Sequence, residues 1–214
     1  MPRRLIRLAA VVGVLASTLM PLPGSSATPK CPLIFDPSGD ATAPPGVSSG
    51  ANFLFPNEPA YDIVSADIAS DRSVITVVIR VLKLATQAPS APMGIEWRFD
   101  FTAGQNTLFA EAVSAAASRT RKAGVSAYIG YVDSTSHLIT STKVVLDFAR
   151  NEVRIRVPIS DFGAYAPTLG TKLTNLVATA GRWYDLPKFT YSETVDRDTT
   201  DNVYILGRKS CIHP

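Results

Sequence analysis

A strict alternation of apolar and charged residues in one segment limits what this chain can fold into. Residues 95–101 read Ile-Glu-Trp-Arg-Phe-Asp-Phe, apolar at each odd position and charged at each even position. This is the pattern of a β-strand with one dry and one wet face, because successive side chains point to opposite faces. Residues 152–157 repeat it, and we expect residues 144–148 to pair with them across a hairpin at 149–151.

Short runs of this kind recur along the chain with almost no helical periodicity. Residues 73–84 are apolar on both faces for much of their length, which is typical of a central strand. Further strands are expected at 61–68, 125–132, 173–180 and 203–206. About eight or more strands at this spacing favour an all-β fold, and specifically an antiparallel β-sandwich of the jelly-roll type.

Two segments need separate interpretation. Residues 108–119 are rich in alanine, which has a high helix propensity, but they follow the turn at 104–106 directly after a strand. We therefore interpret the first half of this segment as the returning strand. Residues 41–59 are rich in Pro, Gly and Ser, which predicts a long surface loop.

The first 27 residues have the organisation of an export signal. Three arginines precede an apolar stretch at 8–20, and the small residues Ser25, Ser26 and Ala27 follow it. The apolar stretch is shorter than the roughly 20 residues that span a bilayer, and no later stretch resembles it. Residues 28–30 contain no lipobox. We therefore expect cleavage after Ala27 and a secreted, extracellular domain at 28–214 with no transmembrane segment.

The charge balance argues against nucleic acid as a partner. The chain has 21 Lys and Arg against 18 Asp and Glu, and the three arginines of the leader account for the whole excess. The longest basic cluster of the mature chain is at 119–122. Without a basic surface, binding to phosphate backbones has no electrostatic basis.

The only two cysteines are Cys31 and Cys211, one near each end of the mature chain. In an exported protein this placement predicts a disulfide that joins the termini, with two free thiols as the alternative. Closing so long a loop would stabilise the fold by about 4.7 kcal/mol or somewhat more in the chain-entropy treatment, and strain in the bond would subtract from this.

Signs of catalysis are weak. Residues 46–50 match a Gly-x-Ser-x-Gly nucleophile motif, but they lack the preceding strand and following helix that this motif requires. His137 and His213 are the only histidines, and both lie in polar or terminal segments. Haem ligation by Met93 and His137 has no support beyond the presence of the two residues. We therefore predict no catalytic residues and a protein that is not an enzyme.

Two acidic segments offer oxygen ligands of the kind that calcium prefers. The candidate calcium ligands are Asp36 and Asp40 in the first segment, and Asp196, Asp198 and Asp201 in the second. The alternative for the first is a turn in which Asp36 bonds its own backbone and Gly39 takes the left-handed conformation. The alternative for the second is a solvated loop with Arg197 as counter-charge. We prefer the turn, and expect no cofactor other than a calcium ion.

Aromatic side chains could form a sugar-binding platform, since a flat ring can cover the face of a pyranose. Trp97 is unsuited because its alternation places it on the dry face. Trp183, Tyr184 and Tyr191 are the candidate ligand-binding residues, just after the expected strand at 173–180. An aromatic plug that closes one end of the sandwich is the simpler interpretation of Trp183.

Four motifs resemble exported bacterial β-sandwich domains. They are Asp-Pro-Ser-Gly-Asp at 36–40, the strand opening at 61–66, Trp-Arg-Phe-Asp-Phe at 97–101 and the strand exit at 156–160. Together they are similar to the DOMON-like domains and the family 9 carbohydrate-binding modules. The resemblance implies a non-catalytic jelly-roll-like module, with relatives that bind sugars, haem or structural calcium.

Three functions follow from these patterns. The first is a secreted, non-enzymatic binding or surface-interaction domain, with polysaccharide or a cell-envelope component as partner. The second is an extracellular hydrolase that uses two carboxylates, which would face each other in a cleft about 5 to 9.5 Å apart. The third is a structural envelope protein without a small ligand, which would expose an apolar patch.

Overall fold

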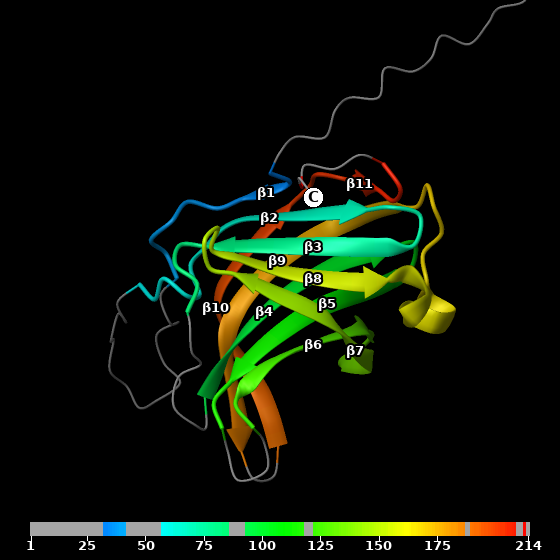
Figure 1. Ribbon diagram of the computed structural model, residues 1–214. Helices are drawn as coiled ribbons and strands as arrows, with labels where there is room; N and C mark the ends of the chain where they lie inside the picture. Colours follow the sequence, from blue (N-terminus) through cyan, green and yellow to red (C-terminus); the bar gives the residue numbers. More distant parts are fainter. Residues whose placement is uncertain are drawn as a thin grey trace, which may run out of the picture.

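The structure is a computed structural model that describes residues 32–41, 57–85, 93–117, 122–186, 189–208 and 212. The side chains of residues 93, 185, 186 and 189–191 are outside that description. In chain order the elements are β1 (Ile34–Phe35), β2 (Ile63–Ser70), β3 (Val74–Val81), β4 (Met93–Ala103), β5 (Asn106–Ala115), β6 (Gly124–Val132), β7 (Ser136–Asp147), β8 (Glu152–Pro158), the 3-10 helix η1 (Ile159–Tyr165), β9 (Lys172–Leu186), β10 (Phe189–Thr200) and β11 (Tyr204–Ile205) (Figure 1). The predicted all-β antiparallel fold is confirmed.

All these strands belong to one antiparallel sheet. Its order is β1-β2-β3-β8-β7-β6-β5-β4-β9-β10, and β11 pairs with β9. The strands from β4 to β8 follow one another as neighbours, so the middle of the sheet is a meander. The β2–β3 hairpin extends it beside β8, and the β9–β10 hairpin extends it beside β4.

The sheet folds over on itself within β7. The first part of this strand, residues 136–142, pairs with β6, whereas residues 143–147 pair with β8. β7 therefore belongs to both halves of the sheet. Figure 1 shows the consequence, because β2, β3 and β8 lie across β4, β5 and β9. The two halves enclose a single hydrophobic core.

The alternating pattern of β4 decides which face of this strand enters the core. Ile95, Trp97, Phe99 and Phe101 are all buried, as their odd spacing predicts. Trp97 is fully enclosed, and its indole Nε1 donates a hydrogen bond to the carbonyl oxygen of Ala60 at 3.1 Å. The even-numbered side chains of β4 consequently lie on the outer face.

The ambiguous alanine-rich segment is a strand, as predicted. β5 occupies residues 106–115 and pairs along its length with β4 and β6. A two-residue loop joins it to β4, and Gly104 in that loop has a φ of 65°, which glycine adopts without steric cost. The predicted β7–β8 hairpin is also confirmed, with Asp147 Oδ1 accepting hydrogen bonds from the N–H groups of Ala149 and Arg150.

The two ends of the sheet meet through side chains. Asp196 Oδ2 on β10 accepts a hydrogen bond from the Ile63 N–H at 2.7 Å, and Asn202 Nδ2 donates to the Leu33 carbonyl at 2.7 Å. The hydroxyl groups of Ser70 and Tyr204 lie 2.9 Å apart. These contacts join β1 and β2 to the segment that contains β10 and β11.

A buried ionic network lies on the outer face of β2, β3 and β8. Arg80 Nη1 is 2.6 Å from Asp67 Oδ2, and its Nε is 2.8 Å from Glu152 Oε1. Both carboxylates are almost wholly buried. Asp67 Oδ1 also accepts the Leu33 N–H, so this network contributes to the position of the short strand β1.

Several expectations fall outside the described residues. These are the export signal, both cysteines of the expected disulfide, His213 and most of the loop at 41–59. Among the described residues, no helix is long and apolar enough to cross a membrane.

Candidate functional site

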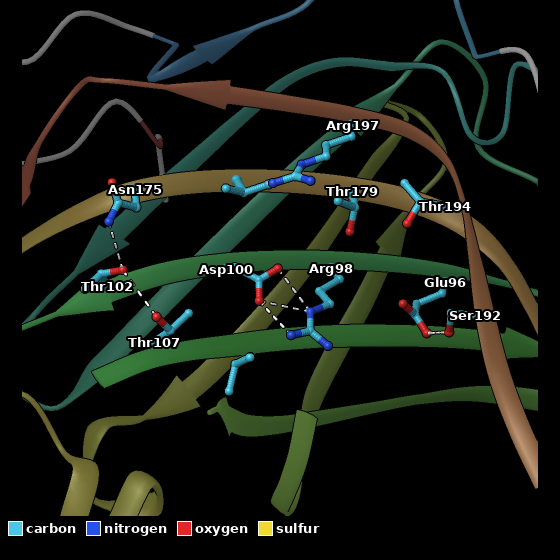
Figure 2. Close-up of a pocket in the computed structure, with 12 residues that line it drawn as sticks. Glu96, Arg98, Asp100, Thr102, Thr107, Asn175, Thr179, Ser192, Thr194 and Arg197 are labelled. Carbon is cyan, nitrogen blue, oxygen red and sulfur yellow. Dashed lines mark hydrogen bonds and ion pairs between the residues drawn. The ribbon is translucent and has the colours of Figure 1, made fainter. Parts of the chain in front are cut away.

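The outer face of the sheet is hollowed over β4, β5 and β9. Two adjoining hollows of about 490 and 460 Å³ share Glu96 and Arg98 of β4 and Ser192 of β10, and we call them together the outer groove. One wall is formed by β10, and the start of β7 contributes Ser136 and Leu138 on the other side. Figure 2 shows Glu96, Arg98 and Asp100 in a row along β4. The groove therefore follows from the alternating pattern of β4, because it is lined by the even-numbered side chains, which point away from the core.

Arg98 is held rigidly at the centre of the groove. Its Nε and Nη2 donate to the carboxylate of Asp100 at 2.7 to 3.1 Å, and its Nη1 donates to Ser136 Oγ at 3.1 Å. The guanidinium carbon lies 3.8 Å from the ring centre of Phe109, which is a cation–π contact. Glu111 Oε2 is 3.7 Å from Arg98 Nη1. The guanidinium is thus positioned before any ligand arrives.

Two further carboxylates in the groove have raised pKa values. Burial raises the pKa of Glu111 to about 7, and the negative charge of Glu96 adds to this effect. Burial likewise raises the pKa of Glu96, although Ser192 donates a hydrogen bond to that carboxylate. Together with Asp100, these acids surround Arg98. Because its pKa is about 7, Glu111 is an available proton donor near neutral pH.

The raised pKa of Glu111 predicts a specific pH dependence of stability. Because the folded protein binds this proton more tightly than the unfolded chain, the stabilisation is present at acidic pH and is lost as the pH rises through about 7. Glu111→Gln should therefore be more stable than the wild type at pH 8, by up to about 3 kcal/mol. At pH 5 the two proteins should converge. Urea unfolding across this pH range measures the difference in unfolding free energy. If the unfolding free energies of both proteins changed equally with pH, the raised pKa of Glu111 would be contradicted.

The predicted aromatic residues do not form one platform. Trp183 lines the outer groove together with Val113 and Tyr128. Tyr184 is the next residue of β9 and faces the other side of the sheet, where its hydroxyl donates to Glu193 Oε2 at 3.0 Å. Tyr191 pairs with Tyr184 through the backbone, and its side chain lies outside the described part. β9 continues to Leu186, so Trp183 lies within a strand and not beyond its end.

The acidic residues proposed for calcium come together from opposite ends of the chain. One carboxylate oxygen from each of Asp36, Asp40 and Asp196 lies within 4.8 Å of the others. Burial, followed by the charge of Asp196, raises the pKa of Asp36 to about 7, and burial raises the pKa of Asp196 to about 6. Asp198 adds to the negative potential at Asp36. Asp201 is exposed and is not part of this group.

The turn after β1 has the predicted left-handed glycine but a different hydrogen-bond partner. Gly39 has a φ of 107°. Its N–H is bound by Asp62 Oδ2 at 2.8 Å, and Asp62 comes from the segment just before β2. The Oδ2 atom of Asp36 is buried and accepts no hydrogen bond. The carboxylate of Asp36 is therefore directed to the acidic group and does not close the turn at Gly39.

His137 stands apart from both sites. Its Nε2 lies 3.0 Å from Asp133 Oδ1 and 3.0 Å from Thr135 Oγ1, and its ring stacks on Tyr131. The side chain is partly exposed. These contacts are those of a surface turn, as expected for a histidine in a polar segment.

Comparison with known proteins adds no assignment. No family model, curated protein or solved structure matches the chain.

The groove acids were missed as site residues in the sequence analysis. Glu96 and Arg98 are visible there as the charged positions of the alternating segment, but a charged strand face is usually solvated. Glu111 was obscured because its segment also resembled a helix. The signal that could have found them is the placement of charged residues at the same face of two neighbouring strands, Arg98 directly opposite Glu111.

Proposed function

We propose that the protein is a secreted, non-enzymatic binding domain whose outer groove holds a polysaccharide chain. The observation that carries this proposal is the position of Trp183 in the groove beside the fixed side chains of Arg98 and Glu96. An aromatic ring supplies an apolar surface for a sugar face, and neighbouring charged groups exchange hydrogen bonds with its hydroxyls.

The charges of the groove favour a neutral, hydroxyl-rich ligand. Glu96, Asp100 and Glu111 offer carboxyl oxygens, and Arg98 is already engaged by Asp100. A polyanion would meet three acids, the neutralised Arg98 and only one further cation, Arg197 on the β10 wall. A sugar hydroxyl, in contrast, can donate to a carboxylate and accept from a protonated Glu111. The two hollows adjoin at Glu96 and Arg98, which suits an extended ligand.

Export and family membership belong to the same proposal. The leader at 1–27 supports secretion. The motifs at 36–40, 61–66, 97–101 and 156–160, which resemble DOMON-like domains and family 9 carbohydrate-binding modules, support a binding role. A binding module outside the cell would meet polysaccharides and envelope glycans as its natural partners.

A carboxylate-dependent hydrolase is the second candidate, and one observation favours it. Glu96 and Glu111 share the groove, and Glu111 has the raised pKa that a general acid needs near neutral pH. In that case Glu111 would protonate a leaving oxygen while Glu96 served as base or nucleophile.

Binding to immobilised glycans separates these possibilities. Trp183→Ala should weaken glycan binding by about tenfold or more, because the ring contributes stacking that no neighbour replaces. Phe148→Ala is the matched control, since Phe148 is an exposed aromatic outside the groove. It should bind as the wild type does.

Hydrolysis is measured on the same glycans by release of reducing ends. The binding-domain proposal predicts no turnover by the wild type and none by Glu111→Gln. Turnover by the wild type that Glu111→Gln abolishes would establish the hydrolase instead. No retention of any glycan by the folded wild type would contradict polysaccharide binding.

A further inference from the structure

The acidic group lies where the two ends of the sheet meet. Asp36 and Asp40 belong to the turn after β1, and Asp196 lies in β10. Asp196 also accepts the N–H of Ile63 at the start of β2 through its Oδ2 atom. Any ligand at this point would therefore touch both edges of the curled sheet.

Asp36 and Asp196 of this group are buried, Asp40 is exposed, and no described cation pairs with any of them. Asp36 and Asp196 are each 7% exposed, and the neighbouring Asp62 is 0% exposed. None of the ion pairs among the described residues involves these three acids or Asp40. Buried carboxylates normally have a cationic or hydrogen-bonding partner, because ionised groups are costly to remove from water.

Orphaned oxygen atoms gather at the same place. In the described part of the chain, four buried side-chain oxygen or nitrogen atoms lack a hydrogen-bond partner: Asp36 Oδ2, Asn57 Oδ1, Asp62 Oδ1 and Asp198 Oδ2. Asp62 and Asp198 lie close enough to Asp36 to act on it electrostatically, and Asn57 Nδ2 donates to Asp62 Oδ2 at 2.7 Å. All four atoms are acceptors. Their concentration beside the acidic group indicates a missing positive charge and not scattered packing faults.

The donor chemistry selects the type of cation. The group and its orphaned neighbours offer carboxylate and amide oxygens only, with no sulfur or imidazole ligand among the described residues. Zinc and copper prefer nitrogen and sulfur, whereas calcium takes 6 to 8 oxygens in a flexible arrangement. Magnesium requires a smaller, near-octahedral shell and retains several waters. An oxygen-only group that draws its ligands from two separate segments therefore suits calcium best.

We propose that Asp36, Asp40 and Asp196 bind a calcium ion that fastens the turn after β1 to β10. Further candidate ligands are the orphaned oxygens of Asp62 and Asp198, whose charges act on Asp36, and of Asn57, which is hydrogen-bonded to Asp62. The ion neutralises the mutual repulsion of the carboxylates, and its effect is to hold the two ends of the sheet together.

Calcium titration of the purified full chain, after treatment with a chelator, tests this proposal. Isothermal calorimetry should show one ion per chain, and about 1 mM calcium should raise the melting temperature in a way that a chelator reverses. Magnesium at the same concentration should bind at least tenfold more weakly. A folded wild-type protein without calcium-dependent heat or melting shift would overturn the proposal, and equal affinity for magnesium would overturn the assignment to calcium.

Two variants distinguish a metal site from a merely structural cluster. Asp36→Asn keeps the side-chain shape but removes a charge, so calcium affinity should fall by about tenfold to a hundredfold. In the absence of metal, the same variant should melt at a higher temperature than the wild type, because one repulsive charge has gone. Asp201→Asn is the matched control, because Asp201 directly follows β10 and is exposed, and it should leave both quantities unchanged. Unchanged affinity in Asp36→Asn would contradict the proposed ligand set.

Discussion

Arg80→Met is expected to destabilise the protein by about 3 to 5 kcal/mol, because it removes the only described cation that contacts Asp67. The side chains of Asp67 and Glu152 are 3% and 6% exposed, so neither carboxylate can recover the lost interaction from water. Glu152 retains Arg154 at 2.7 Å, but Asp67 loses its counter-charge. Chemical denaturation should show a lower midpoint with an unchanged slope.

Two comparisons separate charge from packing. Arg150→Met changes an exposed arginine 3.9 Å from Asp147 and should cost less than about 1 kcal/mol. Adding Asp67→Asn to Arg80→Met should restore part of the lost stability, because the buried charge is then absent. If the double variant were as unstable as the single one, the loss would come from the arginine stem and not from the uncompensated carboxylate.

Trp97→Ala is expected to cost about 3 to 5 kcal/mol of unfolding free energy. The indole is 0% exposed at the centre of the core, and its removal leaves a cavity and an unpaired carbonyl at Ala60. Urea unfolding followed by circular dichroism measures this loss, while Trp97→Phe should retain part of the stability.

The other tryptophan provides the control. Trp183 is half-buried in the wall of the outer groove, so Trp183→Ala should cost clearly less unfolding free energy than Trp97→Ala. The same variant is expected to lose glycan binding. A loss of stability on Trp183→Ala as large as that on Trp97→Ala would contradict the placement of Trp183 at the surface of the groove.

The strands could be predicted wherever one face is wet. Residues 95–101 and 152–157 alternate visibly because β4 and β8 each have one face in the core, and both predictions are confirmed. From the sequence, β9 is expected to end at Ala180, just before Gly181. In the structure, this glycine lies within the strand and packs against the backbone of Glu193 on β10. A glycine at such a position permits close backbone approach and does not end the strand.

The pairing between distant strands could not be predicted. The pairing of β3 with β8 and that of β4 with β9 depend on tertiary contacts that leave no local signal in the sequence. The bend in β7 between Thr142 and Lys143 is marked by neither glycine nor proline. For the same reason, the two acidic segments were identified separately, but their convergence at Asp36 and Asp196 became visible only in the folded chain.

The side-chain bridges between the two ends of the sheet have a consequence for folding kinetics. The meander from β4 to β8 needs only short loops to close, whereas Ile63 and Asp196 are 133 residues apart and Leu33 and Asn202 are 169 apart. Loop-closure entropy opposes such contacts until the intervening chain is ordered. The meander should therefore form early in the folding reaction, and docking of the terminal strands should be the slow, late step.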